Sequence, residues 1–357
     1  YRIQTSSFMR ILYGIQGTGN GHISRALEVL PYLKKKASID ILISGRQSEL
    51  VLPYDIKYQM HGLGFVFGKN GGIDLIETYK KSRLRKFYNE VKTMDLSQYE
   101  VVISDFEPIT AWASMLQNKY CVGLSNQASL LAPNVPKAKG EDFVGRFIIR
   151  NYAPCQNYVG LSYKAYDKSV FTPIIRESIR NKTTSVSRGN YLVYLPAFSD
   201  KKIAKHLGSF ENVNWEVYSK SAREEYSIGN IVFKKLNGQQ FEDSLARCEG
   251  IITAAGFGTT TEALFLGKKL LVVPQKNQYE QACNAVSLKD IGVTVLKSLK
   301  QKNHDVIQNW IDNGEAIQMD YPALTEQIVE RVLSTLKKEI DPYTDYLTQS
   351  QYNLELA

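Results

Sequence analysis

Short runs of β-branched and other apolar residues alternate with longer amphipathic stretches along this chain. An apolar run of roughly four to eight residues between turn signals is typical of a buried strand, and an amphipathic stretch such as His22–Lys36 is typical of a helix. Strands that alternate with helices form βαβ units, so the first half predicts a parallel sheet. Its expected strands are 10–15, 39–44, 99–105, 119–126 and 158–163.

The polar stretch Asn181–Gly189 interrupts this alternation and has no apolar period, so we expect it to link two domains. The sequence predicts an α/β protein whose two Rossmann-like, doubly wound domains, 9–180 and 190–340, face each other across a cleft. Ligands of such sheets bind outside the carboxyl ends of the strands. The expected strands of the second domain are 190–198, 214–219, 230–236, 250–255, 269–274 and 292–296.

Composition narrows the class of protein. With 357 residues, of which 43% are hydrophobic and 22% charged, the chain has material for two cores. No apolar run approaches the roughly 18 residues of a membrane span, and no signal-peptide pattern is seen, so we expect a cytoplasmic protein. The four cysteines follow neither a metal-binding nor a compact disulfide spacing, and we expect them to be reduced: Cys121, Cys155, Cys248 and Cys283.

The chain is basic, with a net charge of +8 and an isoelectric point near 9.0. This charge favours an anionic substrate, an anionic membrane surface or nucleic acid as a partner, and a basic surface without a dedicated partner explains it equally well. Neither an aromatic RNA-binding motif nor a zinc-finger spacing occurs, so we expect no nucleic-acid partner.

A glycine-rich turn follows the first expected strand, in the segment GIQGTGNGHISRALEVL. Glycines let the backbone approach a ligand closely, and a helix start attracts anions. A dinucleotide-binding fingerprint that begins at Gly17 and Gly19 would need a third glycine at position 22, where His22 stands. The second strand ends in Ser44, Gly45 and Arg46 rather than in an acidic residue, which leaves open an NADP enzyme that uses Arg46.

His22 stands where this turn opens a helix, on the side of the predicted cleft. An imidazole titrates near neutral pH and can accept a proton from a hydroxyl group, which makes His22 a candidate general base. The alternative is a histidine that only satisfies a helix start.

A second glycine turn, Gly256-Phe257-Gly258, follows the expected strand 250–255 and opens a helix rich in threonine. Backbone N–H groups at 258–260, together with threonine hydroxyls, favour an anion such as a diphosphate without a metal. Glu262, one turn into the helix, offers two acceptor oxygens to a ribose diol; alternatively, it only complements the helix dipole.

A polar cluster follows the next expected strand, 269–274, at the same edge of the sheet. An acid beside an amide suits the hydroxyl groups of a sugar, whereas each residue alone could be a solvated helix start. Together the two turns predict a nucleotide-sugar site. The residues of this cluster are Gln275, Asn277, Glu280, Gln281 and Asn284.

The segment GFGTTTEALFLGKKLLVVPQ…EQACNA resembles the donor-binding signature of GT-B glycosyltransferases that use UDP-sugars. The similarity extends to the UDP-glycosyltransferases, the lipid-linked peptidoglycan N-acetylglucosaminyltransferase and a branch of uncharacterised bacterial and archaeal relatives. GTGNGHISRALEVL is similar to the first loop of the same proteins. The resemblance is strongest at 11–30 and 250–292 and faint between 130 and 240.

The resemblance implies an inverting, metal-independent hexosyltransferase that uses a UDP-sugar donor and no cofactor. It implies His22 as the general base and Asp105, in VVISDFEPITAWA, as the residue that orients it. The acceptor would be a sugar- or lipid-linked hydroxyl, as in cell-envelope glycans. The implied donor-binding residues are Gly19, Gly256, Gly258, Thr259 and Thr260 around the diphosphate, Glu262 at the ribose, and Glu280 with Gln281 at the sugar.

Two departures from the plant signature keep the donor sugar open: AAGFGT replaces the histidine-cysteine-glycine-tryptophan run, and Glu280 replaces an aspartate. Asp105 and Glu107 also form a D-x-E pattern that binds metal in another transferase fold, although the GT-B pattern argues against it. The rival functions are a nucleotide-sugar epimerase or hydrolase of the same shape, and a non-catalytic binding protein.

The acceptor side of the first half is harder to interpret. A basic helical stretch and the glycine-flanked apolar loop 63–72 predict contact with an anionic membrane, which would make the protein peripheral on the inner face of that membrane. A solvated basic face is the alternative. The basic residues are Lys80, Lys81, Arg83, Arg85 and Lys86.

Overall fold

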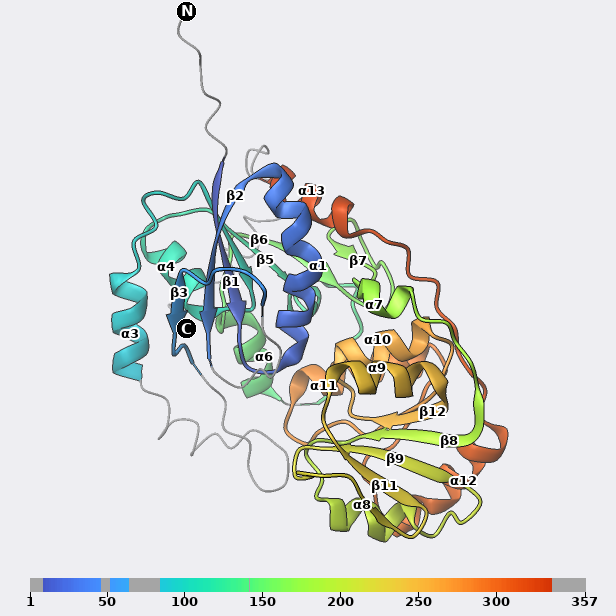
Figure 1. The fold of residues 1–357 in the computed structure, drawn as a ribbon. Coiled ribbons are helices and arrows are strands. Elements are labelled where there is room, and N and C mark those ends of the chain that lie inside the picture. Colours follow the sequence, from blue (N-terminus) through green and yellow to red (C-terminus); the bar gives the residue numbers. More distant parts are fainter. Residues whose placement is uncertain (1–8, 46–51, 64–83, 141, 336–357) are drawn as a thin grey trace, which may run out of the picture.

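The computed structural model describes residues 9–45, 52–63, 84–140 and 142–335 (Figure 1). Several sequence predictions therefore lie outside the described residues. They concern Arg46, Lys80, Lys81, Arg83, nearly all of the loop 63–72 and the tail after Ile340. In the described part of the chain, no helix combines the length and apolarity that a bilayer crossing requires.

The first half forms a seven-stranded parallel sheet in the order β3-β2-β1-β4-β5-β6-β7. β1 lies between β2 and β4, with Ile15 paired to Ile43 of β2 on one side and to Asp105 of β4 on the other. The carboxyl ends of these three strands therefore meet. The strands are β1 (Arg10–Gln16), β2 (Ser38–Ser44), β3 (Tyr58–Met60), β4 (Val101–Asp105), β5 (Cys121–Ser125), β6 (Asn157–Leu161) and β7 (Val170–Phe171).

Helices cover both faces of this sheet because successive strand residues point to opposite sides. Ile11, Tyr13 and Ile15 pack in the core that includes α1, while Leu12 packs in the core that includes α3 and α4. The helices are α1 (Asn20–Lys36), α3 (Leu84–Thr93), α4 (Pro108–Leu116), α5 (Asn126–Ser129), α6 (Phe143–Asn151) and α7 (Glu177–Arg180).

The second half repeats this architecture with a seven-stranded sheet in the order β10-β11-β9-β8-β12-β13-β14. All its pairings are parallel except that of β10 with β11, an antiparallel edge hairpin. The predicted α/β architecture with two doubly wound sheets is confirmed. The strands are β8 (Ser187–Tyr194), β9 (Asn214–Ser219), β10 (Tyr226–Ile228), β11 (Ile231–Lys235), β12 (Cys248–Thr253), β13 (Lys269–Val272) and β14 (Thr294–Val295).

The last described helix returns to the first sheet and lies beside α1 (Figure 1). Lys36 of α1 donates to Glu330 at 2.9 Å, and the hydroxyl of Tyr120 donates to the carbonyl of Thr335 at 2.9 Å. The domain ranges 9–180 and 190–340 stay a prediction. The helices after the first sheet are α8 (Asp200–Leu207), α9 (Gly238–Arg247), α10 (Phe257–Phe265), α11 (Tyr279–Asp290), η1 (Gln301–Asn303), α12 (His304–Asn313) and α13 (Thr325–Ser334).

Gly160 of β6 allows α5 to pack directly on the strand, since a Cβ at position 160 would lie 2.6 Å from the Cα of Ser129. We predict that Gly160→Ala lowers the free energy of unfolding by about 1–3 kcal/mol, because the added methyl group would meet backbone atoms, which cannot move aside as a flexible side chain can. Chemical denaturation measures this change. Gly21→Ala is the control, because nothing lies within 4 Å of a Cβ there. Equal stability of the two variants would contradict the packing described.

Candidate functional site

A cavity of about 610 Å³ lies between the carboxyl ends of the two sheets. The first half contributes the turn after β1, the start of α1 and the start of α5; the second half contributes the ends of β8 and β12 and the starts of α9, α10 and α11. This is where doubly wound sheets bind ligands. Of the predicted site residues, those that line it are Gly19, His22, Gly256, Gly258, Thr259, Glu262, Gln275, Glu280 and Gln281.

Two neighbouring strand ends bring His22 and Asp105 together. Gly17 turns the chain after β1, and its N–H donates to the carbonyl of Ser44 at 2.6 Å. A Cβ at position 17 would lie 2.9 Å from both Ile43 and that carbonyl oxygen, so the turn requires glycine. His22 follows in the first turn of α1, and its Nδ1 lies 2.7 Å from Oδ1 of Asp105 at the end of β4.

Asp105 is fully buried, and a third residue compensates its charge. The guanidinium of Arg25, one turn after His22, donates to both carboxylate oxygens, with 2.8 Å from Nε to Oδ2. Burial alone would raise the pKa of Asp105, but the charges and hydrogen bonds of Arg25 and His22 outweigh burial and lower that pKa. Asp105 is therefore a carboxylate at neutral pH, and it can hold the His22 ring by its Nδ1–H group.

Glu107, the second acid of the D-x-E pattern, is the N-cap of α4. Its carboxylate accepts hydrogen bonds from the N–H groups of Ile109 at 2.8 Å and Thr110 at 2.6 Å. Burial raises the pKa of Glu107, and these hydrogen bonds only partly offset that effect. Within residues 9–45, 52–63, 84–140 and 142–335, no three His, Cys, Asp or Glu side chains cluster as metal ligands.

On the opposite wall of the cavity, α10 begins at the second glycine turn, with Gly256 as the N-cap residue and no side chain bonded to the helix start. The first N–H groups of a helix have no partner within the helix, so they are available to an anion. Gly258 is exposed and nothing lies within 4 Å of a Cβ there. Thr259, partly exposed, lines the same cavity.

Thr260 lies at this turn but does not line the cavity. Its side chain is fully buried, and its hydroxyl bonds the carbonyl of Gly256 at 2.8 Å and the hydroxyl of Tyr163 at 2.8 Å. Its N–H group donates to the carbonyl of Gly256 at 3.3 Å. The hydroxyl of Thr260 therefore links the helix start to the first half of the chain.

Glu262 lines the cavity and is held there by Arg176, which precedes α7. Nε and Nη2 of Arg176 donate to the two oxygens of Glu262 at 2.6 and 2.8 Å, and Nη1 donates to Glu242. Such a bidentate pair fixes the plane of the carboxylate. The partners come from the two halves of the chain, so the pair also ties them together.

Glu280 reaches the first half of the chain through two amides at the start of α5. Asn126 donates to its Oε1 at 2.7 Å, and Gln127 donates to its Oε2 at 2.9 Å. Gln281 accepts from the N–H group of Gln275 at 2.9 Å, and Asn284 donates to the carbonyl of Ala255 at 2.9 Å. Glu280 and Gln281 thus lie side by side at one end of the cavity, with fixed orientations.

Four of the cavity residues that the sequence analysis missed bond a predicted site residue through a charged or amide side chain: Arg25, Asn126, Gln127 and Arg176. Arg25 stands three residues after His22, which places it on the same helix face, and this spacing was a usable signal. Asn126 ends the expected strand 119–126 and Gln127 directly follows it, at the edge where ligands bind, which was a second usable signal. For Arg176, which lies in an irregular segment, no local pattern indicates a site.

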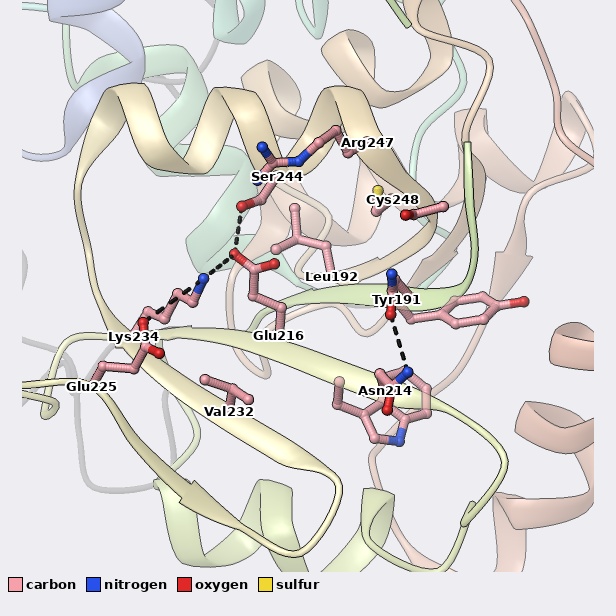
Figure 2. Close-up of a pocket in the computed structure, with 13 residues that line it drawn as sticks. Tyr191, Leu192, Asn214, Glu216, Glu225, Val232, Lys234, Ser244, Arg247 and Cys248 are labelled. Atoms are coloured by element: carbon pink, nitrogen blue, oxygen red, sulfur yellow. Dashed lines mark hydrogen bonds and ion pairs between the residues drawn. The ribbon is translucent and has the colours of Figure 1, made fainter. Parts of the chain in front are cut away.

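A smaller cavity of about 310 Å³ opens at the amino ends of β8 and β9, away from the strand ends that form the site (Figure 2). Two of its charged residues neutralise each other: Glu216 pairs with Lys234 at 3.2 Å and accepts from Ser244. No predicted site residue lines it.

The low pKa of Asp105 predicts a specific loss of stability in acid. As the pH falls below the usual carboxyl value of 3.8, the unfolded chain takes up the proton before the folded protein does, so the stabilisation present above that pH is lost. From about pH 5 to about pH 3, the free energy of unfolding should fall more steeply in the wild type than in Asp105→Asn. Urea denaturation across this range measures both slopes, and equal slopes would contradict the charge pairing.

Residues 9–313 match the model of the family described as glycosyl transferase family 1. No curated protein matches the sequence. Among solved structures, the chain is similar to MurG of Acinetobacter baumannii, at 14% identity and a TM-score of 0.57 over 91% of this chain and 99% of that one. It is also similar to UGT2 of Phytolacca americana, at 10% identity and a TM-score of 0.55 over 97% of this chain and 99% of that one. A third similar structure is UGT89C1 of Arabidopsis thaliana, at 14% identity and a TM-score of 0.55 over 96% of this chain and 99% of that one.

At these identities the likeness shows the fold, which is that of the GT-B structures. The family match is independent of it and extends from the first described residue past the end of α11. The chain belongs to glycosyl transferase family 1 and is a glycosyltransferase of the GT-B type.

Proposed function

We propose that this glycosyltransferase moves a hexose from a UDP-sugar to an acceptor hydroxyl, with inversion at the anomeric carbon. One observation carries the proposal: a histidine–carboxylate pair and an uncapped helix start face the same cavity from opposite halves of the chain. The first can remove a proton from an acceptor, and the second can bind the diphosphate of a donor.

The donor diphosphate lies against the first turn of α10, where the N–H groups of Gly258 and Thr259 donate to it and Gly256 leaves room for it. Hydrogen bonds to a charged group are each worth about 1.5–3 kcal/mol, so a few suffice without a metal or another cofactor. Glu262 accepts the ribose hydroxyls on the lone pairs that Arg176 leaves free. In support, two of the similar structures contain UDP or UDP-2-fluoro-glucose.

The donor sugar lies between Glu280 and Gln281 of α11 and the amides at the start of α5. Gln127 is 5% exposed, and its Oε1 has no hydrogen-bond partner among the residues that the structure describes, although its amide group bonds Glu280. An unpaired buried oxygen favours a ligand that donates, such as a sugar hydroxyl. Gly19, at the turn before α1, also lines the cavity.

The reaction then needs two events on opposite sides of the anomeric carbon. Nε2 of His22 takes the proton of the acceptor hydroxyl while Asp105 holds the ring by Nδ1. The hydroxyl oxygen forms the new bond as the bond to the diphosphate breaks, and the leaving charge moves towards the start of α10. Attack from the face opposite to the leaving group inverts the configuration.

We propose that the protein meets its acceptor at an anionic membrane surface. The main evidence for this proposal is the composition of α6. Phe143, Val144 and Phe147 of this helix are 69%, 47% and 66% exposed. The backbone of Gly145 lies so close to Tyr279 that a Cβ would be 2.3 Å from it, so α6 borders the sugar end of the cavity. Basic residues flank these apolar residues along the sequence, a composition that suits anionic lipid: Lys137, Lys139, Arg146 and Arg150.

The base role of His22 predicts that His22→Ala loses about 10²–10⁴-fold in kcat, because a positioned base contributes that factor. UDP binding should be unchanged, since the donor contacts lie mainly on the other half of the chain. Release of UDP from UDP-glucose, UDP-galactose or UDP-N-acetylglucosamine, with a membrane lipid extract as the acceptor pool, measures the rate. NMR of the product shows whether the anomeric configuration is inverted.

The same assay separates the rival enzymes. Free sugar formed at an equal rate without the extract would indicate a hydrolase, and an epimerised nucleotide-sugar would indicate an epimerase. Full activity of His22→Ala would contradict the base role.

The membrane surface is tested with vesicles of phosphatidylcholine alone or with phosphatidylglycerol. Sedimentation with anionic vesicles should fall about thirty-fold in Arg146→Gln/Arg150→Gln, because each basic residue contributes about 1 kcal/mol near such a surface. Phe143→Ser/Phe147→Ser should also bind less. Leu116→Ser is the control, since Leu116 is 60% exposed on α4. Equal binding to both kinds of vesicle would refute the proposal.

A further inference from the structure

Arg25 gives the His22–Asp105 pair a third, positively charged member. Besides its two bonds to the Asp105 carboxylate, its Nη2 lies 2.9 Å from Nδ1 of His22. The side chain of Arg25 is 8% exposed and that of Asp105 is fully buried, so solvent screens these charges little. Burial alone would lower the pKa of Arg25, but Asp105 outweighs burial and raises it, which keeps the guanidinium charged.

The two neighbours of Nδ1 favour opposite protonation states of that nitrogen. The carboxylate of Asp105 at 2.7 Å accepts a proton from Nδ1, whereas the guanidinium of Arg25 can only donate to it. Nη2 of Arg25 already donates to the same oxygen of Asp105. The neutral ring with its proton on Nδ1 keeps the bond to Asp105 and leaves the lone pair on Nε2, the form that a general base needs.

A second proton on the ring would place two positive charges side by side. With Arg25 present, Asp105 is already neutralised, and an imidazolium adds an uncompensated charge 2.9 Å from a guanidinium nitrogen. Without Arg25, an imidazolium would be the main counter-ion of a buried carboxylate. Arg25 therefore opposes protonation of His22, whereas Asp105 alone would favour it.

The other elements around this group add little charge at short range. From β1, the hydroxyl of Tyr13 donates to Asp105 at 3.4 Å, and burial together with Asp105 raises the pKa of Tyr13 so that it stays neutral. From α11 of the second half, Glu280 acts on Arg25 from a distance and keeps the guanidinium charged. The charges that face His22 are thus Asp105 of β4 and Arg25 of its own helix.

We propose that Arg25 is a positioning residue that neutralises Asp105, and that it thereby keeps the His22 ring uncharged, with Nε2 free for the acceptor. The inference rests on the proposed role of His22 as the base. The alternative is that Arg25 only stabilises the buried carboxylate, in which case its removal would change folding and not the titration of His22.

NMR titration of histidine side chains tests the inference without any substrate. The chain has four histidines, and the His22 signal is assigned by its loss in His22→Gln. In the wild type at neutral pH, the nitrogen shifts should show a neutral ring with its proton on Nδ1. In Arg25→Met, the titration midpoint of His22 should rise by about one to three pH units, the effect of a nearby charge.

Tyr13→Phe is the control, because it removes a neutral partner of Asp105 and should leave the midpoint in place. If Arg25→Met does not fold, Arg25→Lys keeps the charge and should titrate as the wild type does. An imidazolium at neutral pH in the wild type, or an unchanged or lower midpoint in folded Arg25→Met, would overturn the inference. The failure of the base role would be seen separately, as full transferase activity of His22→Ala.

Discussion

The site depends on one topological constraint, which is that parallel strands present all their carboxyl ends at the same edge of a sheet. β1 and β4 are hydrogen-bonded neighbours, so the turn after β1 and the last residue of β4 lie together. β12 and β13 are neighbours in the other sheet, which brings the starts of α10 and α11 together in the same way. The cavity forms where the two edges meet, and each edge supplies a different part of the chemistry.

Three carboxylates in or next to the cavity show how such a site is held before a ligand arrives. Asp105 is compensated by Arg25, Glu262 by Arg176, and Glu280 by the amide of Asn126. Two of these three contacts join the halves of the chain, so the same bonds that satisfy the acids also set the width of the cavity. Orientation is thereby fixed in advance, which limits the reorganisation that a bound donor would require.

Much of the fold could be predicted because each buried strand of a doubly wound sheet shows a local pattern, a short apolar run between turn signals. The edge strands β3, β7 and β10 were not predicted, because each has only two or three residues, too few for a periodic signal. The return of α13 to α1 is set by packing between distant segments, which no window of sequence records.

The candidate site was predictable wherever a residue stood at the end of a strand or the start of a helix. The structure brings His22 and Asp105 within 2.7 Å, although their catalytic roles stay predictions. The direction of the Thr260 hydroxyl was not predictable, because a helical threonine can bond its own backbone instead of a ligand. Arg25 can be taken for an ordinary helix residue until the buried carboxylate beside it is seen.

The central claim, that the cleft holds a UDP-sugar with its diphosphate on α10 and its ribose at Glu262, is tested most directly by thermal-shift measurements without added metal. The ligands are UDP, GDP, dTDP, UDP-sugars and NADP. The control for Glu262→Ala is Glu242→Ala, because Glu242 also accepts a hydrogen bond from Arg176 but does not line the cavity. The account predicts that a UDP species raises the melting temperature of the wild type and of Glu242→Ala, and raises that of Glu262→Ala less. Stabilisation by NADP alone, by no ligand, or by UDP equally in all three proteins would contradict it.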